Sequence, residues 1–132
     1  MERKRRLPPV IDRLPGNPIG LFQRGNDVLM DERDPPGGPA RVGEWVIVSA
    51  RPVPPPGSAW VCGYEYVLVA IAEVGPEGLY RGVVREPPFA QLFRPDVLTL
   101  GTPLTFGMAH VFVVRPGEEG RGRRELTCGS VV

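Results

Sequence analysis

The clearest pattern in the chain is an alternation of apolar and polar positions over residues 66–86. Y-V-L-V-A-I-A-E-V comes first, G-P-E-G follows, and L-Y-R-G-V-V-R-E ends the stretch. β-Branched and aromatic residues favour extended structure, whereas the two glycines and the proline favour a tight turn. The pattern therefore predicts a β-hairpin. Its second strand buries Tyr80 and Val84 and exposes Arg81 and Arg85.

Other short apolar segments are separated by glycine and proline. They cover residues 19–30, 44–50, 59–74, 102–114 and 125–132. Gly25-Asn26 lies between two apolar runs and predicts a hairpin within residues 19–30. Residues 59–74 form either two strands with a bend at Gly63 or one strand with a bulge there. Three consecutive prolines exclude residues 51–58 from a sheet interior and favour polyproline II.

These segments predict an all-β, mainly antiparallel fold of six to eight short strands. A small, partly open β-barrel or a strongly bent sheet fits them best, because closure protects strand edges. The only helical spacing, at Phe89, Leu92 and Phe93, allows at most one helical turn near 88–94. The predicted organisation is an extended arm over 1–43, a core domain over 44–114, and a loop with an edge strand over 115–132.

Composition agrees with one small, loop-rich domain. The chain has 132 residues, an apolar fraction of 42%, 17 glycines and 17 prolines. Such a chain can bury an ordinary core, and its glycines and prolines disfavour helices. The net charge of +1 gives no overall attraction to nucleic acid or membranes. Two weakly basic ends flank a weakly acidic middle.

The basic ends leave nucleic-acid binding open as an alternative. The cationic side chains there are Arg3, Lys4, Arg5, Arg6, Arg121, Arg123 and Arg124. Together they could make a phosphate-binding patch. Aromatic residues that stack on bases are absent from both ends. A solvated pair of tails is therefore favoured over a nucleic-acid interface.

Several motifs over residues 44–114 resemble a group of small bacterial domains of unknown function. The shared pattern is a Tyr-x-Gly hairpin strand, then a proline, then a Gly-Asp-x-Val-x-Phe segment followed by His-Ile or His-Val. Tyr80 and Gly82 match the first element, and Pro87 or Pro88 matches the second. The matches to the last element are Gly101, Leu104, Phe106, His110 and Val111, with Thr102 in place of the usual aspartate. Some members are similar to immunity proteins encoded beside polymorphic toxins, which implies a protein-binding role.

Candidate catalytic and metal-binding groups are few. His110 is the only histidine, with no carboxylate near it in sequence, so a structural histidine is favoured over a general base paired with Cys62. Asp31, Glu32 and Asp34 lack the spacing of a calcium loop and favour a solvated turn. No nucleophile-elbow or phosphate-binding motif occurs. No cofactor, metal site or catalytic residue is predicted.

The two cysteines, Cys62 and Cys128, form no C-x-x-C pair. The basic start is not followed by an apolar run, so it does not read as a secretory signal. No segment is long and apolar enough to suggest a membrane helix. A cytoplasmic protein with reduced thiols is the expectation, with a Cys62–Cys128 disulfide as an alternative.

The most concentrated aromatic residues flank the proline-rich segment, where they either pack the core or form a contact surface. The candidate partner-binding residues are Trp45, Arg51, Trp60, Tyr64, Tyr66, Phe89 and Phe93. Aromatic residues and arginine are typical of interface hot spots. We therefore predict a non-catalytic protein-binding module of the immunity or inhibitor type. Nucleic-acid binding and a structural assembly role remain the alternatives.

Overall fold

The computed structural model describes residues 10–52, 64–86 and 98–117, which form an eight-stranded sheet. The predicted hairpin lies within it. β5 (Glu65–Val74) and β6 (Leu79–Glu86) run antiparallel and are joined by a 3-10 turn, η1 (Pro76–Gly78). Gly78 has a φ angle of 75°, a conformation that glycine adopts without strain. The hairpin prediction is confirmed.

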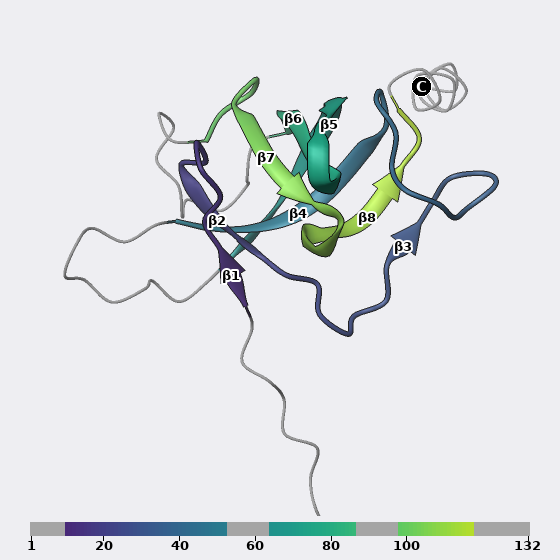
Figure 1. The fold of residues 1–132 in the computed structure, drawn as a ribbon, viewed down its shortest axis with the longest axis horizontal. Helices are drawn as coiled ribbons and strands as arrows, with labels where there is room; N and C mark the ends of the chain where they lie inside the picture. The colour runs from purple at the N-terminus through teal and green to yellow at the C-terminus, as the bar shows by residue number, and fades with distance from the viewer. Residues whose placement is uncertain (1–9, 53–63, 87–97, 118–132) are drawn as a thin grey trace, which may run out of the picture.

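The longest lateral contact of the hairpin is with β4 (Trp45–Pro52), which pairs with β5 along one edge. The other edge of β4 is shared by two strands placed end to end. β8 (Val111–Arg115) pairs with its first half, and β2 (Ile19–Phe22) pairs with its second half. Figure 1 shows β4 crossing behind β7, with β2 near one end of β4 and β8 near the other.

The remaining strands are short and lie at the margins of the sheet. β1 (Ile11–Asp12) pairs with β2, β7 (Pro103–Gly107) with β6, and β3 (Met30–Asp31) with β8, while η2 (Met108–His110) joins β7 to β8. Of the strand pairs in the described ranges, β3 with β8 is the parallel one. Among the described residues, the path from β1 through β2, β4, β5 and β6 to β7 is not closed by backbone pairing. The fold is all-β, mainly antiparallel and open, as the sequence predicts.

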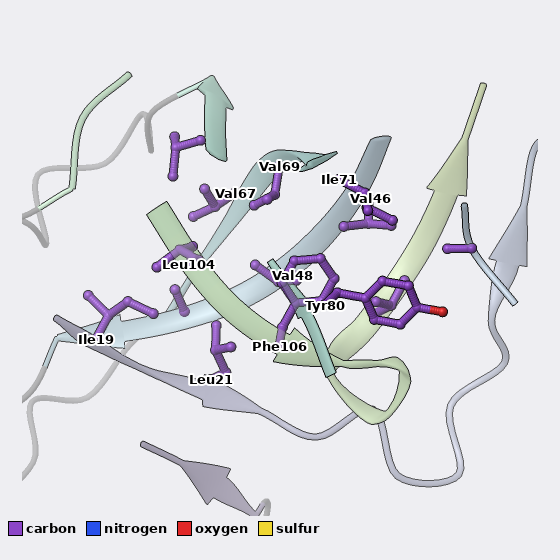
Figure 2. Close-up of a cluster of buried hydrophobic side chains, with 14 of the residues drawn as sticks. Ile19, Leu21, Val46, Val48, Val67, Val69, Ile71, Tyr80, Leu104 and Phe106 are labelled. Carbon is purple, nitrogen blue, oxygen red and sulfur yellow. The ribbon is translucent and has the colours of Figure 1, made fainter. Parts of the chain in front are cut away.

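The core follows the period of two along the strands. Its fully buried members include Ile19, Leu21, Val46, Val48, Val67, Val69 and Phe106 (Figure 2), together with Val84. Tyr80 of β6 stacks on Phe106 of β7, with ring centroids 5.5 Å apart and planes 12° from parallel. Arg81 and Arg85 are exposed on the opposite face of β6. Both faces of this strand are therefore as predicted.

The segment 19–30 is not the hairpin that Gly25-Asn26 suggests. β2 pairs with β1 and β4, and Met30 lies in β3 beside Val113 of β8. Gly25 does lie in a turn, with a φ angle of 62°. Because both edges of β2 are already occupied, the apolar run after the turn cannot pair back onto it and continues to β8.

The N-terminal region also differs from the predicted extended arm. Ile19 and Leu21 are fully buried, and Ala40 is 4% exposed, so the described part of residues 1–43 contributes to the core. Arg51 and Pro52, predicted to lie in the polyproline segment 51–58, instead end β4 and pair with Gly20 and Ile19 of β2. The rest of that segment, the predicted helical turn near 88–94, the bend at Gly63 and the edge strand within 125–132 lie outside the described residues.

Candidate functional site

Four aromatic rings form a row on the face of the sheet opposite the core. They belong to Phe22 at the end of β2, Tyr64 just before β5, Tyr66 in β5 and Phe112 in β8. Successive ring centroids are 5.8, 5.5 and 5.9 Å apart, and successive planes cross at 70°, 80° and 71°. Such edge-to-face pairs are each worth about 0.5–1.5 kcal/mol beyond the area that they bury. We call these four residues the aromatic row.

The strand order explains why residues so far apart in sequence meet here. Tyr64 and Tyr66 are two residues apart and therefore share one face of their strand. Tyr66 lies opposite Ser49 of β4, a residue with a small side chain. In β8, the register against β4 shifts between Ile47 and Val48, and Phe112 is the extra residue at this irregularity.

The two tyrosines are the most accessible members of the row, with Tyr64 52% exposed and Tyr66 54% exposed. Burial raises the pKa of the Tyr66 phenol above its ordinary value of 10.0, and the hydrogen bond with Tyr64 and the charge of Asp27 raise it further. The Tyr66 hydroxyl therefore stays protonated at neutral pH. It presents both an apolar ring and a hydrogen-bonding group at the surface.

Cationic and aliphatic side chains border the row. The Arg51 guanidinium lies over the Phe22 ring, 4.9 Å from its centroid, a cation–π contact at one end of the row. At the other end, Met30 of β3 is 58% exposed and pairs with Val113, the neighbour of Phe112 in β8. An exposed methionine thus lies on β3, the strand next to the one that carries Phe112.

The structure brings together three of the predicted partner-binding residues: Arg51, Tyr64 and Tyr66. Trp45 is only 8% exposed and lies beneath Arg85, whose guanidinium carbon is 5.7 Å from the ring centroid. The other three, Trp60, Phe89 and Phe93, lie outside the described residues. Trp45 therefore adds little accessible surface to a contact face.

Phe22 and Phe112 belong to the row but were not among the sequence candidates. In I-G-L-F the alternation places Phe22 opposite the buried Ile19 and Leu21, so a period of two could have identified it. No local signal identifies Phe112, because V-F-V-V is apolar at every position. Its outward orientation depends on the irregular pairing of β8 with β4.

His110 has the carboxylate partner that its sequence neighbourhood lacks. Its Nε2 atom lies 2.7 Å from Asp12 Oδ2, across 98 positions of sequence, and Gln23 Nε2 donates to the same oxygen at 2.8 Å. The Gly107 N–H donates to His110 Nδ1 at 3.0 Å. Because Nδ1 accepts this hydrogen bond, Nε2 carries the proton and donates it to the carboxylate.

A histidine–carboxylate pair resembles part of a catalytic triad, but this one has the wrong orientation for proton transfer. A general base needs a ring nitrogen that can take a proton from a nucleophile. Here one nitrogen donates to Asp12 and the other accepts from the backbone of Gly107. His110 is also buried, at 4% exposure. These contacts fit a structural role, and Cys62, the proposed nucleophile, lies outside the described residues.

The Asp12 carboxyl gives the fold a pH-dependent contribution to stability. Hydrogen bonds from Gln23 and then His110 lower the pKa of Asp12 below its ordinary value of 3.8, although burial opposes them. A lowered folded-state pKa stabilises the fold above pH 3.8, and the contribution disappears as the pH falls through the folded-state value. We expect wild type to exceed Asp12→Asn in free energy of unfolding by a constant amount near neutral pH.

Urea unfolding from pH 7 to pH 2.5 measures this difference. The difference in free energy of unfolding between wild type and Asp12→Asn is expected to become smaller only below about pH 4. The amide that replaces the carboxylate can still accept a hydrogen bond from Gln23, so the change isolates the charge. If the two proteins have equal free energies of unfolding at pH 7, or if their difference already shrinks above pH 5, the Asp12 carboxyl does not have the lowered pKa assigned to it.

Two of the three acidic residues at 31–34, Asp31 and Glu32, form ion pairs. Asp31 binds Arg33, and Glu32 accepts from Arg115 Nε at 3.0 Å. Within the described ranges, no group of three or more His, Cys, Asp or Glu side chains is arranged to hold a metal ion. All seven cationic residues of the nucleic-acid alternative, Arg3, Lys4, Arg5, Arg6, Arg121, Arg123 and Arg124, lie outside the described residues.

In the part of the chain that the structure describes, no helix has the length and apolar character needed to cross a membrane. Comparison of the chain with protein-family models, with curated proteins and with solved structures finds no match.

Proposed function

We propose that this protein is a non-catalytic protein-binding module and that the aromatic row is its contact surface. The observation that carries the proposal is the pair of half-exposed tyrosines, Tyr64 and Tyr66, held between two further rings. Tyrosine and arginine are enriched at the centres of protein interfaces, and lysine and glutamate are depleted there. The accessible part of the row is Tyr64, Tyr66 and part of Phe112. Phe22, at 8% exposure, supports Tyr64 by ring contact and carries the Arg51 guanidinium over its own ring.

Rigidity is the second property that favours binding through this face. Each tyrosine ring contacts a neighbouring ring on either side, so its rotamer is restricted before a partner arrives. Ordering a free side chain on association costs about 0.5–1.5 kcal/mol. A preorganised row avoids part of this cost, and the paired strands β4 and β5 beneath it fix the spacing of the rings.

The specific form that we propose is an immunity-type or inhibitor protein in a bacterial cytoplasm that neutralises a toxin-like partner. Such a protein needs a stable scaffold and a contact surface and has no need of an active site. The resemblance of residues 44–114 to domains associated with toxin immunity supports this form. The occupied ring nitrogens of His110 agree with it.

The test compares a double variant, Tyr64→Ala with Tyr66→Ala, against Leu100→Ala. Leu100 is an apolar residue 62% exposed that does not belong to the row, so it controls for loss of surface hydrophobicity. Tagged wild type is used to isolate a partner, which is identified and purified, and its affinity for each protein is measured by calorimetry. We expect the double variant to lose at least about 2 kcal/mol of binding free energy, roughly 30-fold in Kd.

Leu100→Ala is expected to bind as wild type does. Unfolding by urea checks that both variants remain folded. Equal affinity of wild type and the double variant would remove the row from the interface. Failure to isolate any protein that binds wild type, together with no toxin-like gene beside its own, would remove the proposed function.

A further inference from the structure

The outer edge of β7 has no strand beside it among the described residues, yet side chains occupy its outward-facing backbone donors. Thr105 directs both its N–H and its C=O away from β6, because both groups bond the Asn17 side chain. Backbone groups along a strand point to alternate edges, so Pro103 and Gly107 face the same way. The outward positions of β7 are therefore Pro103, Thr105 and Gly107.

The Asn17 side chain blocks the central outward position of β7; we call such a side chain, hydrogen-bonded to an outward-facing backbone group of β7, a seal. Asn17 Nδ2 donates to the Thr105 carbonyl at 2.8 Å, and the Thr105 N–H donates to Asn17 Oδ1, also at 2.8 Å. This double exchange reproduces the pair of hydrogen bonds that an antiparallel strand would make with Thr105. Asn17 is 5% exposed, so these bonds are shielded from water.

The sequence L-P-G-N places Asn17 at this position. The Asn17 N–H bonds the Leu14 carbonyl at 3.1 Å, and Gly16 has a φ angle of 86°. Proline followed by a glycine of positive φ is the pattern of a type II turn. This turn comes directly before β2, near one end of the strand order, and Asn17 is its last residue. The Asn17 side chain nevertheless contacts β7, which ends the strand order on the other side.

His110 supplies a second seal, and Pro103 needs none. The Gly107 N–H donates to His110 Nδ1, and Asp12 binds the opposite nitrogen, which fixes the tautomer in which Nδ1 accepts. Pro103 has no backbone donor. All three outward positions therefore lack a free N–H, which gives the only histidine of the chain a structural purpose.

We propose that β7 is a strand-pairing edge which Asn17 and His110 keep closed, and that its occupant when opened is β7 of a second copy of this chain. Exposed edges are commonly protected by charged side chains, but β7 reads P-L-T-F-G and carries none. Two copies placed antiparallel about Thr105 exchange N–H···O bonds there without like-charge repulsion. Within the described residues, the hydrogen bonds from Asn17 and His110 are thus what protects the outer edge of β7 against self-pairing.

Asn17→Ala tests the proposal, because it frees Thr105 and releases the turn from β7. Light scattering follows the mass of each protein over a hundredfold range of concentration. Wild type is expected to remain a monomer, whereas the variant shifts to twice the monomer mass as concentration rises. Asn26→Ala, which changes an exposed asparagine in another turn, is the matched control and is expected to stay monomeric.

A second substitution locates the contact. Thr105→Pro, added to Asn17→Ala, removes the donor that the second copy would use while leaving the bonds to β6, because that N–H faces outward. The double variant is expected to return to the monomer mass. A folded Asn17→Ala that is monomeric at every concentration, or a dimer that Thr105→Pro does not affect, overturns the proposal. Capture of a different protein by the opened edge would overturn the choice of occupant.

Hydrogen exchange of the wild type keeps the proposal testable if Asn17→Ala fails to fold. The amides of Thr105 and Gly107 are expected to exchange as slowly as paired amides of β6, although their partners are side chains. Exchange as fast as that of exposed turn residues would show that the seals do not hold, and the proposal would fail. Asn17→Leu then replaces Asn17→Ala in the mass measurement, since it removes both hydrogen bonds to Thr105 while filling a similar volume.

Discussion

Arg33→Ala is expected to lower the free energy of unfolding by about 3 kcal/mol or more, within the range for removing one partner of a buried ion pair. The Arg33 side chain is 6% exposed, and its ion-pair partners Asp31 and Glu44 are 13% and 17% exposed. Alanine would leave two largely buried carboxylates without their cation. Urea unfolding followed by the fluorescence of the buried Trp45 measures the loss.

The cost is large because one guanidinium serves many acceptors. Arg33 donates to Asp31 at 2.9 and 2.6 Å, to Glu44 at 3.2 Å, and to the carbonyls of Gly37, Gly38 and Pro39 at 3.0, 2.9 and 3.0 Å. The Arg33 guanidinium also holds the pKa of the Asp31 carboxyl well below its ordinary value. The loop between β3 and β4 is thus folded around this side chain.

Two variants control this prediction. Arg33→Lys keeps the charge but offers three donors on one atom in place of a planar fork, so an intermediate loss is expected. Arg13→Ala changes an exposed arginine and is expected to alter stability by less than about 0.5 kcal/mol. If Arg33→Ala unfolds at the same urea concentration as Arg13→Ala, the loop does not depend on the guanidinium.

The hairpin and the two faces of β6 could be predicted from sequence because their signals are local. Alternation with a period of two assigns the faces, and G-P-E-G fixes the turn between β5 and β6. The concentration of aromatic residues beside the proline-rich segment likewise grouped Tyr64 with Tyr66. Features that depend only on neighbours in sequence could therefore be predicted from the sequence.

The sequence could not predict features that depend on which strands become neighbours. Asp12 contacts His110 only because β1 pairs with β2, which places β1 close to η2. Phe22 contacts Tyr64 because β2 and β5 pair with opposite edges of β4. Arg33 reads as one charge in a solvated acidic turn, yet it is buried because three loop carbonyls point toward it. Such placements follow from tertiary pairing.

Gly82→Ala is the second large effect expected, at about 3 kcal/mol of unfolding free energy, the upper part of the usual range for overpacking a core. Gly82 lies on the buried face of β6, between Tyr80 and Val84. A Cβ atom there would lie 2.5 Å from the Ala70 carbonyl oxygen and 2.6 Å from a Val69 methyl carbon. The Ala70 carbonyl oxygen belongs to the backbone of β5 and cannot rotate away, so β5 and β6 must move apart to admit the methyl group.

Gly107→Ala is the matched control, because it adds the same methyl group to a strand glycine without a clash. Gly107 has a φ angle of −114°, and its Cβ would meet only His110 Nδ1, at 3.9 Å. Alanine is therefore expected to leave stability unchanged or to raise it by up to about 1 kcal/mol, since it restricts the unfolded chain. Comparable urea midpoints for the two variants would show that a methyl group fits between β5 and β6 at position 82, contrary to the structure. A lower midpoint for Gly82→Ala alone would tie the stability of the sheet to the close approach of these strands.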